Sequence, residues 1–378
     1  MKRLICLVLA CALVCGGAPC AAAEPAGLTV SAPSAVLMHP SGKVLFEKNA
    51  HEPLAPASVT KVMTLLLIME ALDSGAIALD DMVTGSAHAA SMGGSQIWLK
   101  EGEQLTVDEM IKCIVVASAN DCAVAMAEHI AGSEEVFVER MNARARELGM
   151  EDTHFVNCCG LDADGHLTTA YDIALMSAEL IRHEKIFDYT LIWQDTIRGG
   201  AFTLTNTNRL IRSYDGMTGL KTGSTSTAGF CLAATASRDG LDLIAVVMKA
   251  ETSGARSADI TAMLNYGFAG FASVTPTPDR PLMPIPVELG TQAEVPVELG
   301  AAQPILIEKS RLGGLEKNIV MEERLRAPVA AGQQVGSMTV LADGEVLQQT
   351  PIVAAQDVPF LGVWGIFRQM LRQLCMRE

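Results

Sequence analysis

Three short motifs bring together the residue types that an acyl-transfer enzyme needs. In chain order they are S-x-x-K at Ser58 and Lys61, S-x-N at Ser118 and Asn120, and K-T-G at residues 221–223. A serine hydroxyl is a weak nucleophile, so a neighbouring base has to take its proton. Residues three apart on a helix share a face, and Lys61 can therefore lie beside Ser58. The motifs predict acylation of Ser58 with Lys61 as the base.

The other motif residues have complementary tasks in such a reaction. A lysine acts as a base only when its pKa is lowered, and we expect burial and a second cation, Lys221, to lower it. Ser118 can relay a proton to a leaving amine, and Asn120 can hold a substrate amide. Lys221 and Thr222 can bind a carboxylate or a carbonyl. The backbone N–H of Ser58, free at the start of a helix, can donate to an oxyanion.

Each motif alone also has a simpler interpretation. Ser58 can be a helix N-cap and Lys61 a solvated first-turn lysine, and a chain of this length contains about one S-x-x-K by chance. The order and placement of the motifs favour catalysis. A predicted strand and turn precede S-x-x-K, which opens a predicted helix, and K-T-G lies on a predicted strand.

The elements that must position these motifs follow a mixed α+β order. A hairpin is predicted over residues 35–46, and a long apolar segment at 59–72 predicts a buried helix. Thr106 and Glu109 form a capping box that begins an amphipathic helix at 107–117. Further helices are predicted at 121–131, 134–148, 169–181 and 256–266, and strands at 219–222, 229–237 and 242–249. This order differs from the regular alternation of strands and helices that produces a parallel sheet.

The N-terminus has the layout of a secretory signal peptide. Lys2 and Arg3 precede an apolar run, and small residues at 21–23 offer a cleavage site, so we expect residues 1–23 to be removed on export. An uncleaved anchor is the alternative. The formal net charge of −15 excludes nucleic acid as a partner, because phosphates need a basic surface.

Composition divides the remainder into three parts. A Pro-rich stretch that starts at Thr275 separates a catalytic domain at 24–274 from a small β domain at 275–355, in which Pro-Val-Glu-Leu-Gly occurs twice as two similar short strands. The tail at 356–378 has an apolar stripe from Phe360 to Leu374 beside arginines. This pattern is typical of an amphipathic helix at a membrane interface. A terminal helix docked on the protein's own core is the alternative.

The cysteines and histidines show no metal pattern. The chain has ten cysteines and seven histidines, and the spacing of neither type is that of a zinc site, so we expect no metal and no cofactor. Cys113 and Cys231 lie in apolar runs and are predicted to be small core residues. Cys158 and Cys159 are adjacent, and adjacent cysteines seldom bridge each other, so no disulfide is assigned.

The three motifs and their order resemble those of penicillin-recognising serine enzymes, and within them the low-molecular-weight D-alanyl-D-alanine carboxypeptidases of the penicillin-binding protein 5 type. The stretches that show the likeness lie at 56–64, 93–97, 117–121, 160–172 and 215–223. The resemblance runs from about residue 35 to the C-terminus. It implies a penicillin-binding transpeptidase/β-lactamase-like fold, with an antiparallel sheet packed by helices and a helical lobe, followed by the β domain and the terminal helix.

The resemblance also implies a role for each matching residue. Ser58 is the acylated nucleophile and Lys61 its base, while Ser118 and Asn120 lie on the facing lobe. The sheet edge holds the substrate through Lys221, Thr222 and Gly223. Ser224 would supply the second oxyanion N–H, and Arg256 is the best match for an arginine that binds the substrate's terminal carboxylate. The sequence departs from the family's pattern at two places, which are the extra length at Thr218-Gly219 and the Cys158-Cys159 pair.

By the same resemblance, the substrates are peptidoglycan stem peptides that end in D-Ala-D-Ala, and β-lactams are covalent inhibitors. The enzyme is expected at the outer face of the cytoplasmic membrane, in the periplasmic or cell-wall space, with its tail on the membrane surface. A β-lactamase is the nearest rival, but no E-x-x-L-N occurs between Ser118 and Lys221. A non-catalytic penicillin sensor is the other, and steady release of D-alanine would separate the carboxypeptidase from both.

Overall fold

A five-stranded antiparallel sheet forms the centre of the first domain. The computed structural model describes residues 28–375, so the predicted signal peptide lies outside the described residues. The strand order is β2-β1-β9-β8-β7, with bounds β1 Ser34–Met38, β2 Val44–Lys48, β7 Met217–Thr225, β8 Gly229–Arg238 and β9 Leu241–Ala250. The predicted N-terminal hairpin and the three late strands are confirmed, and each late strand is longer than its prediction.

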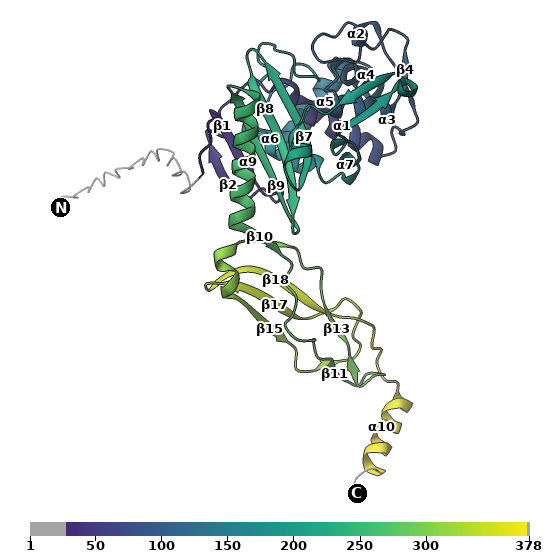
Figure 1. Cartoon of the computed structure of the whole chain (residues 1–378). Coiled ribbons are helices and arrows are strands. Elements are labelled where there is room, and N and C mark those ends of the chain that lie inside the picture. Colours follow the sequence, from purple (N-terminus) through teal and green to yellow (C-terminus); the bar gives the residue numbers. More distant parts are fainter. Residues whose placement is uncertain (1–27, 376–378) are drawn as a thin grey trace, which may run out of the picture.

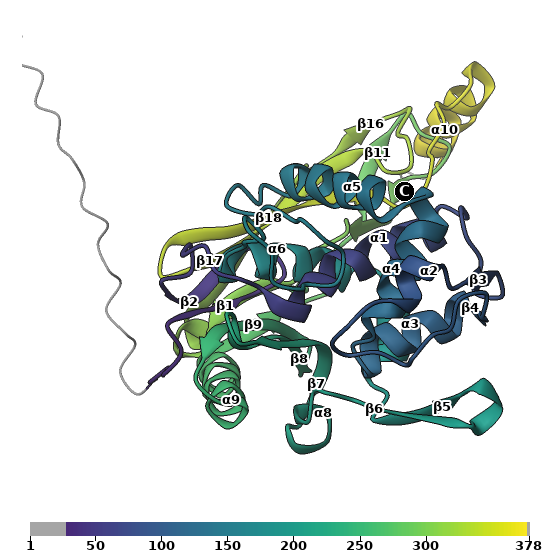
Figure 2. The ribbon, with the colours of Figure 1, turned by 90° about the horizontal axis from the view of Figure 1, so that it is seen from above.

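Apolar layers cover both faces of this sheet. Because side chains alternate along a strand, Leu37 of β1 joins the cluster of α9 (Ser253–Gly270) on one face. Val36 and Met38 join the cluster on the opposite face, which contains α1 (Lys61–Asp73) and α6 (Ala170–Leu180). Figure 2 shows α9 on one side of the sheet and α1 and α6 on the other. The predicted buried helix is thus the central helix of the domain.

A helical lobe packs beside the sheet. Its parts are β3 Met82–Thr84, α2 Ala87–Ala90, β4 Gln104–Thr106, α3 Val107–Val116, α4 Asn120–Ala131 and α5 Glu134–Glu147. The predicted capping box is present, because Thr106 Oγ1 accepts from the Glu109 N–H at 3.2 Å and Glu109 Oε2 accepts from the Thr106 N–H at 3.2 Å. This cap fixes where α3 begins, and α3 leads directly to the S-x-N motif.

Short elements that the sequence did not predict connect α6 to β7. They are η2 Glu184–Ile186, α7 Phe187–Thr190, β5 Gln194–Ile197, η3 Arg198–Gly200, β6 Phe202–Thr205 and α8 Leu210–Ser213. Strands β5 and β6 form a hairpin that projects from the domain (Figure 2). The segment between β6 and α8 returns to the edge of β7, where the K-T-G motif lies.

The second domain is all-β. Strand β10 (Phe271–Val274) pairs with β14, and two further sheets have the orders β12-β11-β16 and β13-β18-β17-β15. The bounds are β11 Ile285–Glu288, β12 Glu294–Val295, β13 Val297–Leu299, β14 Ile305–Glu308, η4 Lys309–Gly314, β15 Leu315–Met321, β16 Leu325–Arg326, β17 Gln334–Ala342 and β18 Glu345–Ala354. Both Pro-Val-Glu-Leu-Gly stretches contain a strand, as predicted, although β11 and β13 belong to different sheets.

The terminal helix α10 (Val363–Cys375) extends beyond the β domain, at the end far from the five-stranded sheet (Figure 1). Val363 and Trp364 are 82% and 83% exposed, so α10 is not docked on a core through these side chains. Phe360 forms a β-bridge with Gly290 instead of belonging to the helix, which corrects the predicted start of the stripe. Among residues 28–375 no helix has the length and apolar character needed to cross a membrane.

Candidate active site

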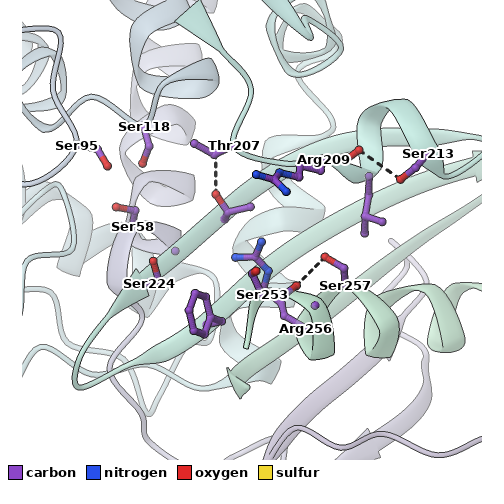
Figure 3. A pocket seen from close by; sticks show the side chains of 15 residues that line it. Ser58, Ser95, Ser118, Thr207, Arg209, Ser213, Ser224, Ser253, Arg256 and Ser257 are labelled. Carbon is purple, nitrogen blue, oxygen red and sulfur yellow. Dashed lines mark hydrogen bonds between the residues drawn. The ribbon is translucent and has the colours of Figure 1, made fainter. Parts of the chain in front are cut away.

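The three motifs meet in one cavity between the sheet and the helical lobe. The cavity has a volume of about 470 Å³, and its walls include Ser58, Ser118, Thr222, Ser224 and Arg256. Figure 3 shows Ser58 and Ser118 facing each other, with Ser224 beside Ser58 on the sheet side. Residues that lie more than 150 positions apart in the chain are thus brought together by the packing of η1, α4 and β7.

Ser58 lies in a tight turn and not in the α-helix itself. The 3₁₀ turn η1 (Ala57–Thr60) carries Ser58, and α1 begins at Lys61, whereas the sequence predicted that Ser58 opens the helix. Strand β7 packs directly on this turn. A Cβ atom at Gly223 would lie 2.9 Å from the backbone nitrogens of both Ser58 and Val59. The glycine of K-T-G therefore permits the close approach that places the backbone of Ser224 next to Ser58.

Lys61 is fully buried and directs its amine at Ser58. Its Nζ donates to Ser58 Oγ at 3.1 Å, to Asn120 Oδ1 at 2.5 Å and to the carbonyl oxygen of Cys159 at 2.7 Å. Burial lowers the pKa of Lys61 below the ordinary lysine value, because the charged form is poorly solvated in the protein interior. The geometry and the pKa direction both suit a base for the Ser58 hydroxyl.

The second lysine contacts the second serine. Lys221 Nζ donates to Ser118 Oγ at 2.8 Å and to the Thr222 carbonyl at 3.0 Å. Burial lowers the pKa of Lys221 well below the usual range, and repulsion from Lys61 and Arg256 lowers it further. The sequence predicted that burial and Lys221 both lower the pKa of Lys61. Burial is the cause of the Lys61 shift, as predicted, whereas the repulsion between the two lysines is expressed in the pKa of Lys221.

Asn120 links the base to a loop of the helical lobe. Its Oδ1 accepts from Lys61, its Nδ2 donates to the Gly93 carbonyl at 2.7 Å, and its backbone N–H donates to the Ser95 carbonyl at 2.7 Å. The neighbouring carboxylate of Asp121 accepts from two backbone N–H groups of the same loop, at 2.9 and 3.0 Å. Both ends of the Asn120 side chain are therefore engaged within the protein. Its Nδ2 has a second hydrogen to donate, so binding of a substrate amide by Asn120 stays a prediction.

The far side of the cavity is cationic. Arg256 is 8% exposed, and its Nη1 donates to the Cys231 carbonyl at 3.3 Å. Within the described residues, its Nε is buried and has no hydrogen-bond partner. Burial lowers the pKa of Arg256. Figure 3 shows the Arg209 guanidinium pointing toward that of Arg256. Two guanidinium groups suit a carboxylate ligand.

Thr207 and Arg209 are among the cavity residues that sequence reasoning missed. Thr207 Oγ1 accepts from Thr222 Oγ1 at 2.7 Å, and Arg209 lines the cavity. Both lie in Asn206-Thr-Asn-Arg209, a polar stretch with two buried asparagines that hydrogen-bond to each other. Asn208 Nδ2 also donates to the Gly219 carbonyl at 3.2 Å. Asparagines at alternate positions in a polar stretch upstream of the predicted strand at 219–222 are the signal that could have identified this loop.

The extra length at Thr218 is absorbed by a β-bulge. The pairing of β7 with β8 shifts register between Met217 and Gly219, so Thr218 has no partner residue in the ladder. Its hydroxyl donates to Thr235 Oγ1 at 2.8 Å. Beyond the bulge the register is regular through Lys221, Thr222 and Gly223. The departure from the simplest form of the motif therefore leaves the K-T-G segment in its place on the sheet edge.

Comparisons with known proteins agree with this geometry. Residues 19–252 match the family model described as D-alanyl-D-alanine carboxypeptidase, and residues 279–359 match the C-terminal domain of penicillin-binding protein 5. The chain is similar to the D-alanyl-D-alanine carboxypeptidase DacF of Bacillus subtilis, with 43% identity over 96% of both chains.

Solved structures show the same fold. Penicillin-binding protein 5 of Haemophilus influenzae superposes with a TM-score of 0.71 and 30% identity, over 88% of this chain and 98% of that one. Penicillin-binding protein D2 of Listeria monocytogenes, solved in an ampicillin-bound form, superposes with a TM-score of 0.59 and 32% identity, over 64% of this chain and 99% of that one. The penicillin-binding transpeptidase-like fold that the sequence predicted is confirmed.

The chain has the family's domain along most of its length, the family's β domain after it, and a close relative over nearly its whole extent. It therefore belongs to the D-alanyl-D-alanine carboxypeptidases of the penicillin-binding protein 5 type, which are serine-type hydrolases of peptidoglycan.

Proposed function

We propose that the chain removes the terminal D-alanine from peptidoglycan stem pentapeptides through an acyl-enzyme on Ser58, with Lys61 as the general base. The observation that supports this most directly is the buried Lys61 amine at 3.1 Å from Ser58 Oγ. In its neutral form the amine takes the hydroxyl proton while Oγ attacks the carbonyl of the penultimate D-alanine. The Ser58 and Ser224 backbone N–H groups stabilise the resulting oxyanion.

Departure of D-alanine requires a proton at the leaving nitrogen. Ser118 Oγ faces Ser58 across the cavity and accepts a hydrogen bond from Lys221 at 2.8 Å. Its hydroxyl proton is thus free to point at the leaving amine, and Lys221 supplies the replacement. Asn120 orients Lys61 through its Oδ1. Before the second half of the reaction, Lys61 loses to solvent the proton that it took from Ser58, and Lys221 regains one. Water then attacks the acyl carbon while the neutral Lys61 amine takes its proton and returns it to Ser58 Oγ, so the shortened peptide leaves and Ser58 is restored.

The terminal carboxylate of the substrate has a matching site. Thr222 lies on the edge of β7, and Arg256 and Arg209 form the cationic end of the same cavity. The buried Nε of Arg256, which has no partner among the described residues, gains one when a carboxylate binds. We assign the recognition of the free C-terminus to Arg256, with Arg209 as a second cation. This assignment accounts for a carboxypeptidase, because an internal peptide bond has no carboxylate there.

β-Lactams fit the same site as covalent inhibitors. The Listeria relative was solved with ampicillin bound. A lactam carbonyl can occupy the oxyanion site and be attacked by Ser58 Oγ as the peptide carbonyl is. The ring-opened product keeps its amine tethered, so the leaving group stays in the cavity.

The proposed place of action is the outer face of the cytoplasmic membrane. The signal-peptide pattern of residues 1–23 supports export. The exposed apolar side chains of α10, among them Trp364 and Phe367, support contact with a membrane surface. In the periplasmic or cell-wall space the enzyme meets newly made stem peptides and thereby regulates cross-linking.

The substitution Ser58→Ala tests the assignment. We expect the variant to show no covalent labelling by a fluorescent penicillin and no release of D-alanine from a diacyl-D-Ala-D-Ala peptide. Ser91→Ala changes an exposed serine of the helical lobe. It is the matched control and should behave as the parent. Undiminished labelling of Ser58→Ala would refute the assignment of Ser58 as the nucleophile. Labelling of the parent without steady D-alanine release would favour a sensor, and rapid penicillin turnover would favour a β-lactamase.

A further inference from the structure

The adjacent cysteines Cys158 and Cys159 hold the helix that carries the base. The Cys159 carbonyl accepts from Lys61 Nζ at 2.7 Å, and the Cys158 carbonyl accepts from Thr64 Oγ1 at 2.5 Å. Lys61 and Thr64 are three residues apart in α1, so both acceptors address the same face of that helix. The conformation of the Cys158–Cys159 backbone therefore sets the position of the Lys61 amine.

The two thiols differ in reactivity. Both side chains are buried and unbridged. A hydrogen bond from the Cys158 thiol and the nearby positive charge of Lys61 lower the pKa of Cys159 to about 7, whereas burial raises the pKa of Cys158 well above the usual range. A thiolate in an electropositive setting is the nucleophile in thiol chemistry, and a neighbouring thiol can resolve its adducts.

We propose that Cys158 and Cys159 form a modification site for small-molecule disulfides, and that closure of a bridge between them switches off acylation of Ser58. The Cys159 thiolate attacks a disulfide RSSR and forms a mixed disulfide, releasing RS⁻, which takes up a proton. Cys158 then loses its proton to solvent, attacks Cys159 Sγ and expels the second RS⁻, which also becomes RSH. The cysteines are oxidised by two electrons, and RSSR is reduced to two RSH.

Closure of this bridge has to move the backbone. Consecutive Cα atoms are about 3.8 Å apart across a trans peptide, but disulfides join residues whose Cα atoms are about 4.4–6.8 Å apart. Rotation of the peptide bond between the cysteines to cis would only shorten this distance, so the bridge can close only if the backbone torsions beside that peptide change and the bridge is strained. The oxygen of that peptide is the Cys158 carbonyl that holds Thr64, and the next carbonyl holds Lys61. Bridge formation therefore moves the acceptor of Thr64 directly and the acceptor of Lys61 through the adjoining peptide, and this consequence rests on the role of Lys61 proposed above.

A loop controls access to the pair. Asn157 Oδ1 accepts from the backbone N–H groups of Cys159 and Gly160 at 3.2 and 2.7 Å, and Asn157 Nδ2 donates to the Leu161 carbonyl at 2.9 Å. Leu161 and the residues to Gly165 are exposed, so the buried pair leads directly into a surface loop. Reagents reach the thiols when this loop opens locally, and modification is expected to be slow compared with that of a surface thiol.

The test treats the full chain with 4,4′-dithiodipyridine, an aromatic disulfide, under native conditions. We expect a product lighter by two hydrogens in intact-mass analysis, with a bridge mapped to Cys158 and Cys159 by peptide digestion. Acylation by fluorescent penicillin should fall at least ~10-fold and recover on addition of dithiothreitol. Intact mass and mapping report on the bridge independently of any catalytic role, whereas the untreated protein reports on the function of Ser58 and Lys61.

Two matched double variants complete the design, each compared with its own untreated sample. Cys158→Ala with Cys159→Ala keeps both backbone carbonyls and should lose the sensitivity to the reagent. Cys113→Ala with Cys122→Ala removes two buried cysteines of α3 and α4 in the helical lobe. This variant should remain as sensitive to the reagent as the parent. The proposal is overturned if treated native protein shows no bridge at 158–159, or if the bridged protein acylates at the untreated rate.

Discussion

At the residue scale, the property of Lys61 that a substitution can test is its ability to lose a proton. Arginine would keep the positive charge, but its guanidinium does not lose a proton near neutral pH. For Lys61→Arg we expect the acylation rate to fall at least ~10²-fold, the scale of general-base catalysis. Stopped-flow mixing with a fluorescent penicillin measures the rate. Lys112→Arg, in a surface ion pair with Asp108, is the control, and a near-normal rate for Lys61→Arg would place the base elsewhere.

Gly223 gives a second prediction at this scale. A Cβ atom there would meet the backbone nitrogens of Ser58 and Val59 at 2.9 Å, and backbone atoms cannot turn aside as the end of a side chain can. For Gly223→Ala we expect the turn to shift at a cost of about 1–3 kcal/mol, with acylation slowed about tenfold or more. Gly313→Ala, where a Cβ atom would meet nothing within 4 Å, is the control for thermal unfolding and labelling.

The sequence identifies the motif residues of the cavity but not their surroundings. Ser58, Lys61, Ser118 and Lys221 could be predicted because acyl transfer restricts both residue type and spacing. Arg209 could not, because it reaches the cavity through a loop whose path depends on the bulge at Thr218 and on buried asparagine contacts. The Cys159 carbonyl could not either, since a backbone acceptor for Lys61 has no residue type by which to recognise it.

At the element scale, a series of hydrogen bonds connects the turn η1 to a loop that is distant in the sequence. Val156 N–H donates to Nδ1 of His166 at 2.9 Å, so Nε2 carries the imidazole proton and donates to Thr60 Oγ1 at 2.8 Å. Thr60 Oγ1 in turn donates to the Ala57 carbonyl at 2.8 Å. A protonated His166 would lose the first of these bonds, because its Nδ1 would become a donor.

These hydrogen bonds predict that the stability of the folded protein falls in acid. Burial lowers the pKa of His166 from 6.5 to about 4, so the unfolded state binds a proton at a pH where the folded state does not. The folded protein should therefore lose about 3 kcal/mol from this group as pH falls from 6.5 to 4. Urea unfolding across that window measures the loss. His166→Gln should show a flatter pH dependence, and His129→Gln, at an exposed position, should follow the parent. Identical slopes in all three proteins would refute the assignment.

Element prediction succeeded where a signal extended over several turns or residues. The capped helix α3, the apolar helix α1 and the long strands β8 and β9 each have a cap or a sustained apolar pattern. The four-residue helices and the β5–β6 hairpin were missed, because one turn or four residues hold too little periodicity to distinguish them from a loop. Phe360 was placed on the helical stripe by its spacing, but a β-bridge to Gly290 determines its conformation.

At the scale of the whole molecule, the β domain lies between the active site and α10 (Figure 1). The two domains are joined through β10, which follows α9 directly and pairs with β14. Lys309 Nζ also donates to the Phe268 carbonyl of α9 at 2.7 Å. An active site at one end and an apolar helix at the other would let a membrane-bound enzyme reach stem peptides away from the membrane surface.

The last prediction concerns this tail. A cut at residue 355 would remove Val358, which is fully buried in the β domain, so the truncated chain should end at Gly362. We expect it to remain soluble and to cleave a small diacyl-D-Ala-D-Ala peptide at the full-length rate, because every motif lies in the first domain. The full-length protein should co-sediment with anionic liposomes, since Trp364 and Phe367 would enter the interface while Arg368 meets anionic headgroups.

The full-length double variant Trp364→Glu with Phe367→Glu is the matched control, because it keeps the helix but removes two of its exposed aromatic side chains. It should stay in the supernatant with anionic liposomes and keep its activity on the small peptide. If the unaltered chain also stays in the supernatant, α10 is not an anchor. If the shortened chain loses both solubility and activity, the helix serves the fold, and the side chains exposed in this structure must pack against the protein in solution.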